Sequence, residues 1–119
     1  MHGDYLRAGA IARFSPVMEE VVAYARRGGP VLGICNGFQI LTKAGILPGL
    51  NKNFEQEATL FHNDSAKFEA RWTHLKATEG PCVWTKDLPP QIYLPVAHGE
   101  GKFIPKSQAL LKSLKDNGQ

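Results

Sequence analysis

The sequence has no long apolar run, only two cysteines and no strong excess of one charge. A membrane-spanning helix needs about 20 consecutive apolar residues, and the N-terminus has no apolar stretch of the signal-peptide type. The two cysteines lack the spacing of a metal site, and their contexts differ too much for a disulfide framework. We therefore expect a soluble protein of a reducing compartment, the cytoplasm, with no membrane partner and no metal.

The charge pattern also argues against nucleic acid as a partner. The formal net charge is +3, and the basic residues are scattered. Surfaces that follow a phosphate backbone cluster their cations, whereas the pair Arg26-Arg27 stands at the end of a predicted helix, where cations suit the helix dipole. With 119 residues, of which 43% are hydrophobic, the chain has the size and composition of one globular domain, residues 1–119.

The first half of the chain has the pattern of an α/β protein. Residues 15–27 predict an amphipathic helix, with Ser15 as the N-cap, Pro16 at the first helical position and two glycines as the stop. Residues 30–34 are a short apolar run, which is typical of a strand buried on both faces. A second helix is predicted over residues 38–44. Helix, strand, turn and helix in this order predict a doubly wound, mostly parallel sheet.

The pattern changes beyond Pro48. Residues 67–73 and 92–96 alternate apolar and polar side chains, which predicts two half-exposed strands. Residues 107–117 place three leucines on one face of a final helix. We expect these strands to be antiparallel additions to the parallel core.

The most informative segment, Gly-Ile-Cys-Asn-Gly, lies between the predicted buried strand and the helix that follows it. Gly33 and Gly37 permit the tight, strained turn called a nucleophile elbow, which presents a side chain at the carboxyl end of a strand. Cys35 would face a helix N-terminus, which favours thiolate, and the N–H of Asn36 could receive an oxyanion. The alternative is that Cys35 is a small buried residue, the role expected for Cys82.

A cysteine nucleophile needs a base, and one of the four histidines has a suitable neighbour. His98 and Glu100 follow the predicted strand 92–96 at a spacing in which a carboxylate can orient an imidazole. From the residues alone, Cys35, His98 and Glu100 make a plausible triad. The other histidines stand at a frayed end or among polar residues, and surface positions are expected for them: His2, His62 and His74.

Residues 33–39, Gly-Ile-Cys-Asn-Gly-Phe-Gln, resemble the nucleophile motif of class I, triad-type glutamine amidotransferases. The Asn-Gly-Phe-Gln continuation is most similar to that of the small glutaminase subunits of phosphoribosylformylglycinamidine synthases. Residues 3–10, 63–72 and 95–101 resemble further stretches of the same family, so the resemblance spans nearly the whole chain.

The resemblance implies a flavodoxin-like α/β domain, a three-layer sandwich around a mostly parallel sheet. It also implies that Cys35 attacks the side-chain amide of L-glutamine, forming a thioester that water hydrolyses. Asn36 matches the oxyanion-hole amide, and Gln39 matches a position that helps to hold glutamine. The ammonia would pass to a synthetase partner in de novo purine biosynthesis. ATP and magnesium would bind that partner, and this chain would carry no cofactor.

Two departures from the family pattern bear on activity. Family members carry a strand, a helix and further strands ahead of the stretch that starts here at Gly3, and a glycine-rich turn among them supplies the second oxyanion donor. The family's catalytic His-Pro-Glu motif does not occur here, and His98 and Glu100 match a separate family segment. We therefore expect a partial domain, truncated at both ends, with little or no glutaminase activity as an isolated chain.

Other interpretations stay open. The chain could be an inactive docking module of the synthetase with a vestigial cysteine. It could also be a different nucleophile-elbow protein, either a cysteine hydrolase of the α/β-hydrolase kind or a redox sensor, because both place a nucleophile on the same turn. The Asn-Gly-Phe-Gln continuation argues against the last two.

Overall fold

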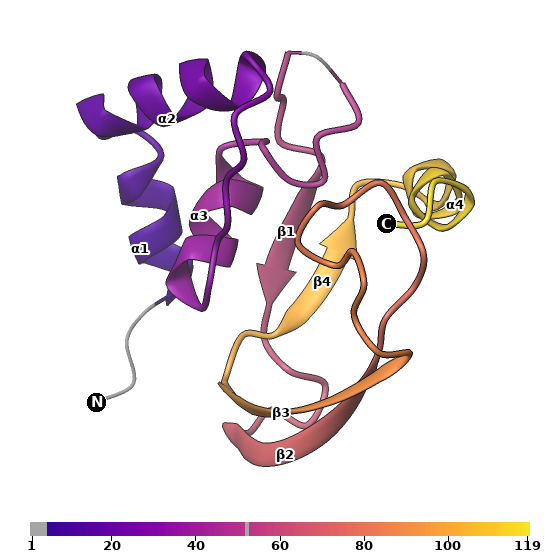
Figure 1. Cartoon of the computed structure of the whole chain (residues 1–119). Coiled ribbons are helices and arrows are strands. Elements are labelled where there is room, and N and C mark those ends of the chain that lie inside the picture. The colour runs from indigo at the N-terminus through magenta and orange to yellow at the C-terminus, as the bar shows by residue number, and fades with distance from the viewer. Residues whose placement is uncertain (1–4, 52) are drawn as a thin grey trace.

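The computed structural model describes residues 5–51 and 53–119, in which four helices and four strands form. His2 and the start of the stretch 3–10 lie outside the described residues. Figure 1 shows the first three helices on one side, the paired strands β1 and β4 beside them, and the last helix at the far side. The elements in chain order are α1 (Tyr5–Ala12), α2 (Pro16–Arg26), α3 (Asn36–Lys43), β1 (Ala58–Phe61), β2 (Glu69–Lys76), β3 (Gln91–His98), β4 (Lys102–Pro105) and α4 (Gln108–Asp116).

The three predicted helices are present, with boundaries set by local signals. α2 begins at Pro16 after an extended Ser15, whose side chain makes no capping hydrogen bond, and the chain turns away at Gly28, where φ is +83°. α4 has a true N-cap, because the Ser107 hydroxyl accepts the N–H of Leu110 at 3.1 Å. α3 begins earlier than predicted, directly after Cys35.

Helix α1 is not predicted by the sequence patterns, which place no element ahead of residue 15. It packs against α3 at Gly9, which is buried. A Cβ on Gly9 would lie 3.4 Å from the backbone oxygen of Gln39 and 3.3 Å from the Cγ of Lys43. Glycine therefore allows the two helices to approach closely, at a position where it is a poor helix former.

The strand predicted over residues 30–34 is not formed among the described residues. Residues 30–34 belong to no helix or strand and pair with no strand in the described part of the chain. Leu32 and Ile34, expected in a core, are 57% and 75% exposed. A strand needs a neighbour to satisfy its backbone groups, and here the indole N–H of Trp84 donates to the Val31 carbonyl at 3.3 Å instead.

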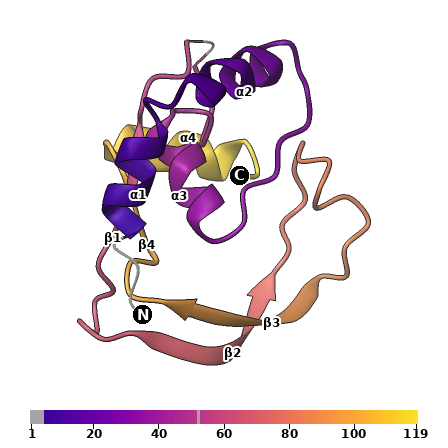
Figure 2. The same ribbon diagram turned by 90° about the vertical axis from the view of Figure 1, so that its left-hand side faces the viewer.

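Both sheets of the described residues are small and antiparallel, so the parallel sheet expected from the first half does not form among them. β1 pairs with β4, and β2 pairs with β3. The antiparallel strands predicted beyond residue 50 are confirmed, and β1 and β4 are additional. Figure 2 shows the β2–β3 pair running as a long ribbon beneath the helices. The result is a set of helices and short sheets that fits an incomplete α/β domain.

The apolar core lies where α3, β1, β4 and α4 meet. Leu41 of α3, Leu60 of β1 and Leu110 of α4 are each less than a tenth exposed. Thr42 is fully buried, and its hydroxyl donates to the carbonyl oxygen of Phe38 at 2.8 Å, so it leaves no unpaired polar group. This core fixes α3, and with it the turn at Cys35, relative to β1.

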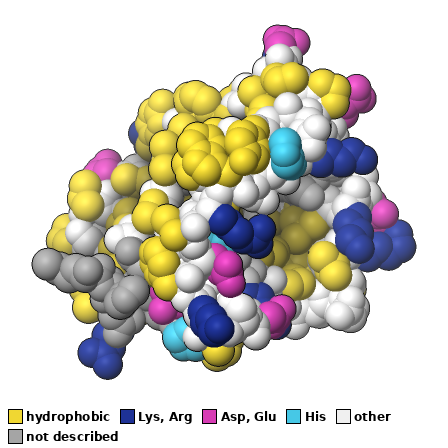
Figure 3. All heavy atoms as spheres, turned by 90° about the horizontal axis from the view of Figure 1, so that it is seen from below, with side chains coloured by type: hydrophobic (Ala, Val, Ile, Leu, Met, Phe, Trp, Pro, Cys, Tyr) yellow, Lys and Arg dark blue, Asp and Glu magenta, His cyan; other side chains and the backbone are white. Residues whose placement is uncertain are grey.

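The β2–β3 ribbon carries large apolar side chains on its outside. Trp72 and Tyr93 stack with ring centroids 5.1 Å apart, and they are 58% and 54% exposed. Figure 3, the view from below, shows apolar side chains in several groups separated by charged ones. No helix among the described residues is long and apolar enough to cross a membrane.

Candidate active site

Cys35 occupies a strained turn between residues 30–34 and helix α3. Its backbone has φ 57° and ψ −118°, a region that side chains other than glycine seldom adopt. A Cβ on Gly33 would stand 2.6 Å from the Cδ1 of Leu41, so this glycine is required. A Cβ on Gly37 would meet nothing within 4 Å. The predicted tight turn is present, but only Gly33 is needed for close approach.

The Cys35 side chain is exposed and not part of the core. The interpretation of Cys35 as a small buried residue is therefore wrong, and so is the buried position expected for Cys82, which is also exposed. At the start of α3, the N–H groups of Gly37 and Phe38 donate to the carbonyls of Ile34 and Cys35. The N–H of Asn36 takes part in neither bond, and the first N–H groups of a helix are the ones that bind anions.

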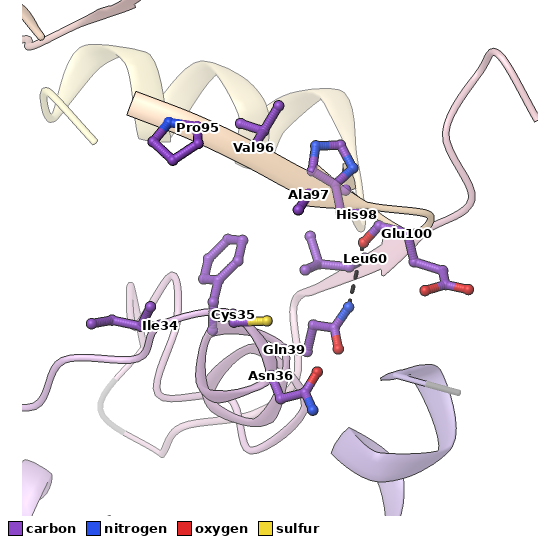
Figure 4. A pocket seen from close by; sticks show the side chains of 12 residues that line it. Ile34, Cys35, Asn36, Gln39, Leu60, Pro95, Val96, Ala97, His98 and Glu100 are labelled. Carbon is purple, nitrogen blue, oxygen red and sulfur yellow. Dashed lines mark hydrogen bonds between the residues drawn. The ribbon is translucent and has the colours of Figure 1, made fainter. Parts of the chain in front are cut away.

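A cavity of about 390 Å³ opens beside the thiol. Figure 4 shows α3 on one side of it and β3 on the other, with the sulfur of Cys35 pointing into the space between them. One wall is apolar and the other is formed by polar residues of α3 and the turn after β3. The lining residues are Ile34, Cys35, Asn36, Phe38, Gln39, Leu60, Pro95, Val96, Ala97, His98, Glu100 and Gly101.

Two side-chain oxygens of the lining residues are buried without a partner. They are the Oδ1 of Asn36 and the Oε1 of Gln39, one helical turn apart on α3. Gln39 is only 8% exposed, and its Nε2 donates to the carbonyl oxygen of Glu100 at 3.4 Å. An unpaired buried acceptor costs about 1–3 kcal/mol. Because both oxygens are closed off from solvent, a ligand in the cavity would reach them only after the two side chains turn.

The spacing-based triad does not form as a hydrogen-bonded chain. His98 and Glu100 reach the same cavity as Cys35, but the imidazole of His98 lies on the opposite side of β3 from Ala97 and points away from the sulfur (Figure 4). Its Nδ1 is 2.9 Å from the Oδ1 of Asn63. The alternation of side chains along a strand explains this result, since Ala97 faces Cys35 and its neighbour cannot.

The carboxylate of Glu100 has a different histidine as its neighbour. Its Oε1 lies 3.7 Å from the Nδ1 of His62, and the Glu100 side chain is 16% exposed. His62 and His74 are exposed, as predicted. The pairing of His62 with Glu100 was not predicted, because the two residues are brought together only when β1 pairs with β4. Within residues 5–51 and 53–119, no group of three His, Cys, Asp or Glu side chains could hold a metal ion.

An exposed cysteine at a strained turn, at the start of a helix and beside a cavity, has the geometry of a nucleophile-elbow protein. The model of the CobB/CobQ-like glutamine amidotransferase domain family matches residues 2–119, and the chain belongs to this family. The family model covers both the motif of residues 33–39 and the turn after β3, so the two segments belong to one domain family.

Curated relatives and one solved structure agree with this family. The chain is 48% identical over 120 residues to the phosphoribosylformylglycinamidine synthase subunit PurQ of Nostoc sp., covering 99% of this chain and 49% of the relative. It is 45% identical to the PurQ subunit of Thermomicrobium roseum, covering 99% and 47%. A structure of PurLQS from Thermotoga maritima matches with a TM-score of 0.70 and 34% identity, over 89% of this chain and 47% of that chain. The chain thus spans about half the length of the relatives it matches.

Proposed function

We propose that this chain carries the nucleophile and part of the glutamine site of a phosphoribosylformylglycinamidine synthase glutaminase. The observation that carries the proposal is the exposed thiol of Cys35 at the strained start of α3. The family match and the PurQ relatives support glutamine as the substrate. Residues 1–119 form part of a single glutamine amidotransferase domain.

In the proposed reaction, the thiolate of Cys35 attacks the side-chain amide carbon of glutamine. The N–H of Asn36 donates to the oxyanion that develops on the amide oxygen. The C–N bond then breaks, the leaving nitrogen takes a proton from a general acid, and ammonia departs. Water attacks the thioester carbon, which releases glutamate and restores the thiol.

The polar wall of the cavity suits the amino-acid end of this substrate. Glutamine brings N–H donors in its α-ammonium and amide groups, and the side-chain oxygens of Asn36 and Gln39, which have no partner, become acceptors for them when these side chains turn toward the cavity. The apolar wall, with Leu60, Pro95 and Ala97, suits the methylene groups between them. Gln39 is therefore a binding residue, and Asn36 contributes its backbone to the oxyanion and its side chain to the substrate.

The partner in this proposal is the synthetase subunit, which binds ATP and magnesium and consumes the ammonia in purine biosynthesis. The PurLQS neighbour, of which this chain covers 47%, supports such a complex. A cytoplasmic location fits the two free cysteines. No cofactor is assigned to this chain.

We also propose that residues 30–34 are one strand of the mostly parallel sheet of a flavodoxin-like three-layer sandwich. The exposed side chains of Leu32 and Ile34 support this assignment, because both would be buried between two layers. The position directly ahead of Cys35 supports it as well, since an elbow follows the carboxyl end of a strand.

A glutamine-shaped chloroketone, 2-amino-4-oxo-5-chloropentanoate, tests the proposal, because it alkylates a thiol without needing the general acid. We expect mass spectrometry to find the label on Cys35, with saturation kinetics and protection by L-glutamine. Cys82→Ser, which removes the other exposed thiol, should leave the labelling unchanged, and Cys35→Ser should abolish it. Iodoacetamide, which has no glutamine shape, serves as the comparison reagent.

Two results would contradict the proposal. Labelling of Cys35 that neither saturates nor responds to glutamine would show a reactive thiol without a glutamine site, as in another cysteine hydrolase or a redox sensor. Capture of the synthetase subunit by Cys35→Ser, combined with no glutamine-dependent labelling of the unaltered chain, would favour the docking-module interpretation.

A further inference from the structure

Asn63, in the connection between β1 and β2, is the centre of a hydrogen-bond network that joins two distant parts of the chain. Its Nδ2 donates to the carbonyl oxygens of Lys67 and His98, each at 2.9 Å. Its Oδ1 accepts the N–H of Gly101 at 3.0 Å and lies 2.9 Å from the Nδ1 of His98. Its backbone N–H donates to the carbonyl of Gly99 at 2.9 Å. All of the polar groups of this side chain have partners, as a structural role requires.

The network fixes the orientation of the Asn63 amide and the tautomer of His98. The carbonyls of Lys67 and His98 can only accept, so the amide nitrogen must face them. The amide oxygen then faces Nδ1 of His98, which must carry a hydrogen to donate. In the neutral imidazole, Nε2 is consequently the unprotonated nitrogen.

The turn of residues 98–101 is held tightly by these bonds. A Cβ on Gly101 would stand 2.2 Å from two atoms of the His98 ring, so the imidazole packs directly on the turn. The turn carries Glu100, whose carbonyl oxygen accepts the Nε2 of Gln39 at 3.4 Å. Through this bond, the position of Glu100 determines which way the Gln39 amide faces, and the Oε1 of Gln39 is left buried without a partner.

We propose that Asn63 is a positioning residue for the Cys35 cavity, acting through the 98–101 turn and the Glu100 carbonyl on the Gln39 side chain. The ligand that benefits is an α-amino acid carboxamide, a statement that rests on the proposed function. Asn63 itself does not line the cavity. His98 has an architectural role in the same network, with its Nδ1–H bound to Asn63.

Asn63→Ala and Asn63→Asp test the proposal, with Asn51→Ala as the matched control. Asn51 is another loop asparagine, whose Oδ1 accepts the N–H of Glu55 at 3.1 Å away from the cavity. The first measurement is ¹⁵N NMR of the His98 ring and of the Gln39 side-chain amide. We expect the Nδ1–H tautomer of His98 to be lost in Asn63→Ala and kept in Asn63→Asp, which retains the acceptor. The Gln39 amide signals should shift in both variants and not in Asn51→Ala.

The second measurement is the concentration of the glutamine chloroketone that gives half-maximal labelling of Cys35. It should rise about tenfold in Asn63→Ala, the effect of one lost hydrogen bond in the binding site. The rate with iodoacetamide should stay the same, because the thiol itself is unchanged. If Asn63 had only a structural role, the substitution would change the labelling of Cys35 by both reagents or by neither.

Unchanged Gln39 amide signals in a folded Asn63 variant would overturn the positioning role, whatever the labelling shows. If Asn63→Ala fails to fold, the Gln39 amide signals of Asn63→Asp test the positioning role in its place. Failure of the proposed function has a different signature, since the unaltered chain would then show no saturable labelling while the NMR responses of His98 and Gln39 persist.

Discussion

The backbone of Gly33 lies against that of Gly37 so closely that a Cβ on Gly33 would stand 2.7 Å from the Gly37 carbonyl oxygen. The contact closes the turn that presents Cys35, and it is asymmetric, because a Cβ on Gly37 would meet nothing within 4 Å. The two glycines that frame the thiol therefore have different functions.

Gly33→Ala should lower the free energy of unfolding by about 1–3 kcal/mol, because the added methyl group has no space between α3 and the turn. Gly37→Ala should be neutral or stabilising by up to about 1 kcal/mol, since alanine suits a helix better than glycine. Urea unfolding of the two variants is the measurement. Equal losses from both substitutions would contradict the asymmetric contact.

Gln39→Leu should raise the free energy of unfolding by up to about 1 kcal/mol. It should also abolish the saturable chloroketone labelling of Cys35 that L-glutamine prevents. The physical reason is that leucine removes a buried acceptor without a partner and gives up only one long hydrogen bond. Thermal unfolding measures the first effect and chloroketone kinetics the second. A loss of both stability and labelling would show that Gln39 is a core residue and not a binding residue.

Ser65→Ala should raise the pKa of Glu69 toward its ordinary value of 4.5. The Ser65 hydroxyl donates to the Glu69 carboxylate at 2.6 Å, and this hydrogen bond is the main reason that the pKa of Glu69 lies below that value. The charges of Arg71 and His98 lower the pKa further by a smaller amount. Because the folded pKa is the lower one, the stabilisation is present above pH 4.5 and is lost as the pH falls through the folded pKa. An NMR titration of the Glu69 side chain measures the change, and Ser113→Ala on the exposed side of α4 is the control.

The 119-residue chain, assayed alone, should release glutamate from glutamine at a rate several orders of magnitude below that of a complete triad enzyme. The reason is local, since the imidazole of His98 binds Asn63 and faces away from Cys35. His98→Ala should therefore not abolish the small residual rate, and any change should be the modest one that follows from disturbing the Asn63 network. Fast release that requires both Cys35 and His98 would revive the spacing-based triad.

Local signals made much of the fold predictable. The helices at 15–27 and 107–117 were visible because their starts and stops lie in the same few residues as the helices themselves. The β2 and β3 strands were visible because apolar and polar residues alternate along the sequence with a period of two, although neither strand has a buried residue in the structure. The elbow was visible because the glycines, the cysteine and the helix follow one another directly.

The remainder depends on residues far apart in the sequence. An apolar run predicts that a segment is buried, but it does not predict which segment pairs with it. Residues 30–34 pair with no strand among the described residues. Helix α1 packs on α3 through Gly9, a contact between distant residues that no local pattern predicts. The network of Asn63 with Gly101 joins residues 38 positions apart, and a spacing of two between His98 and Glu100 suggested a triad that strand alternation prevents.

The backbone of Cys35 has a consequence for protein engineering. A non-glycine residue in such a conformation costs about 1–3 kcal/mol, and glycine would relieve most of it. Laboratory evolution that rewards heat resistance alone would therefore enrich glycine at position 35 and discard the thiol. A thermostabilisation campaign on this domain has to fix that position in advance, or it will select a more stable chain that lacks the proposed nucleophile.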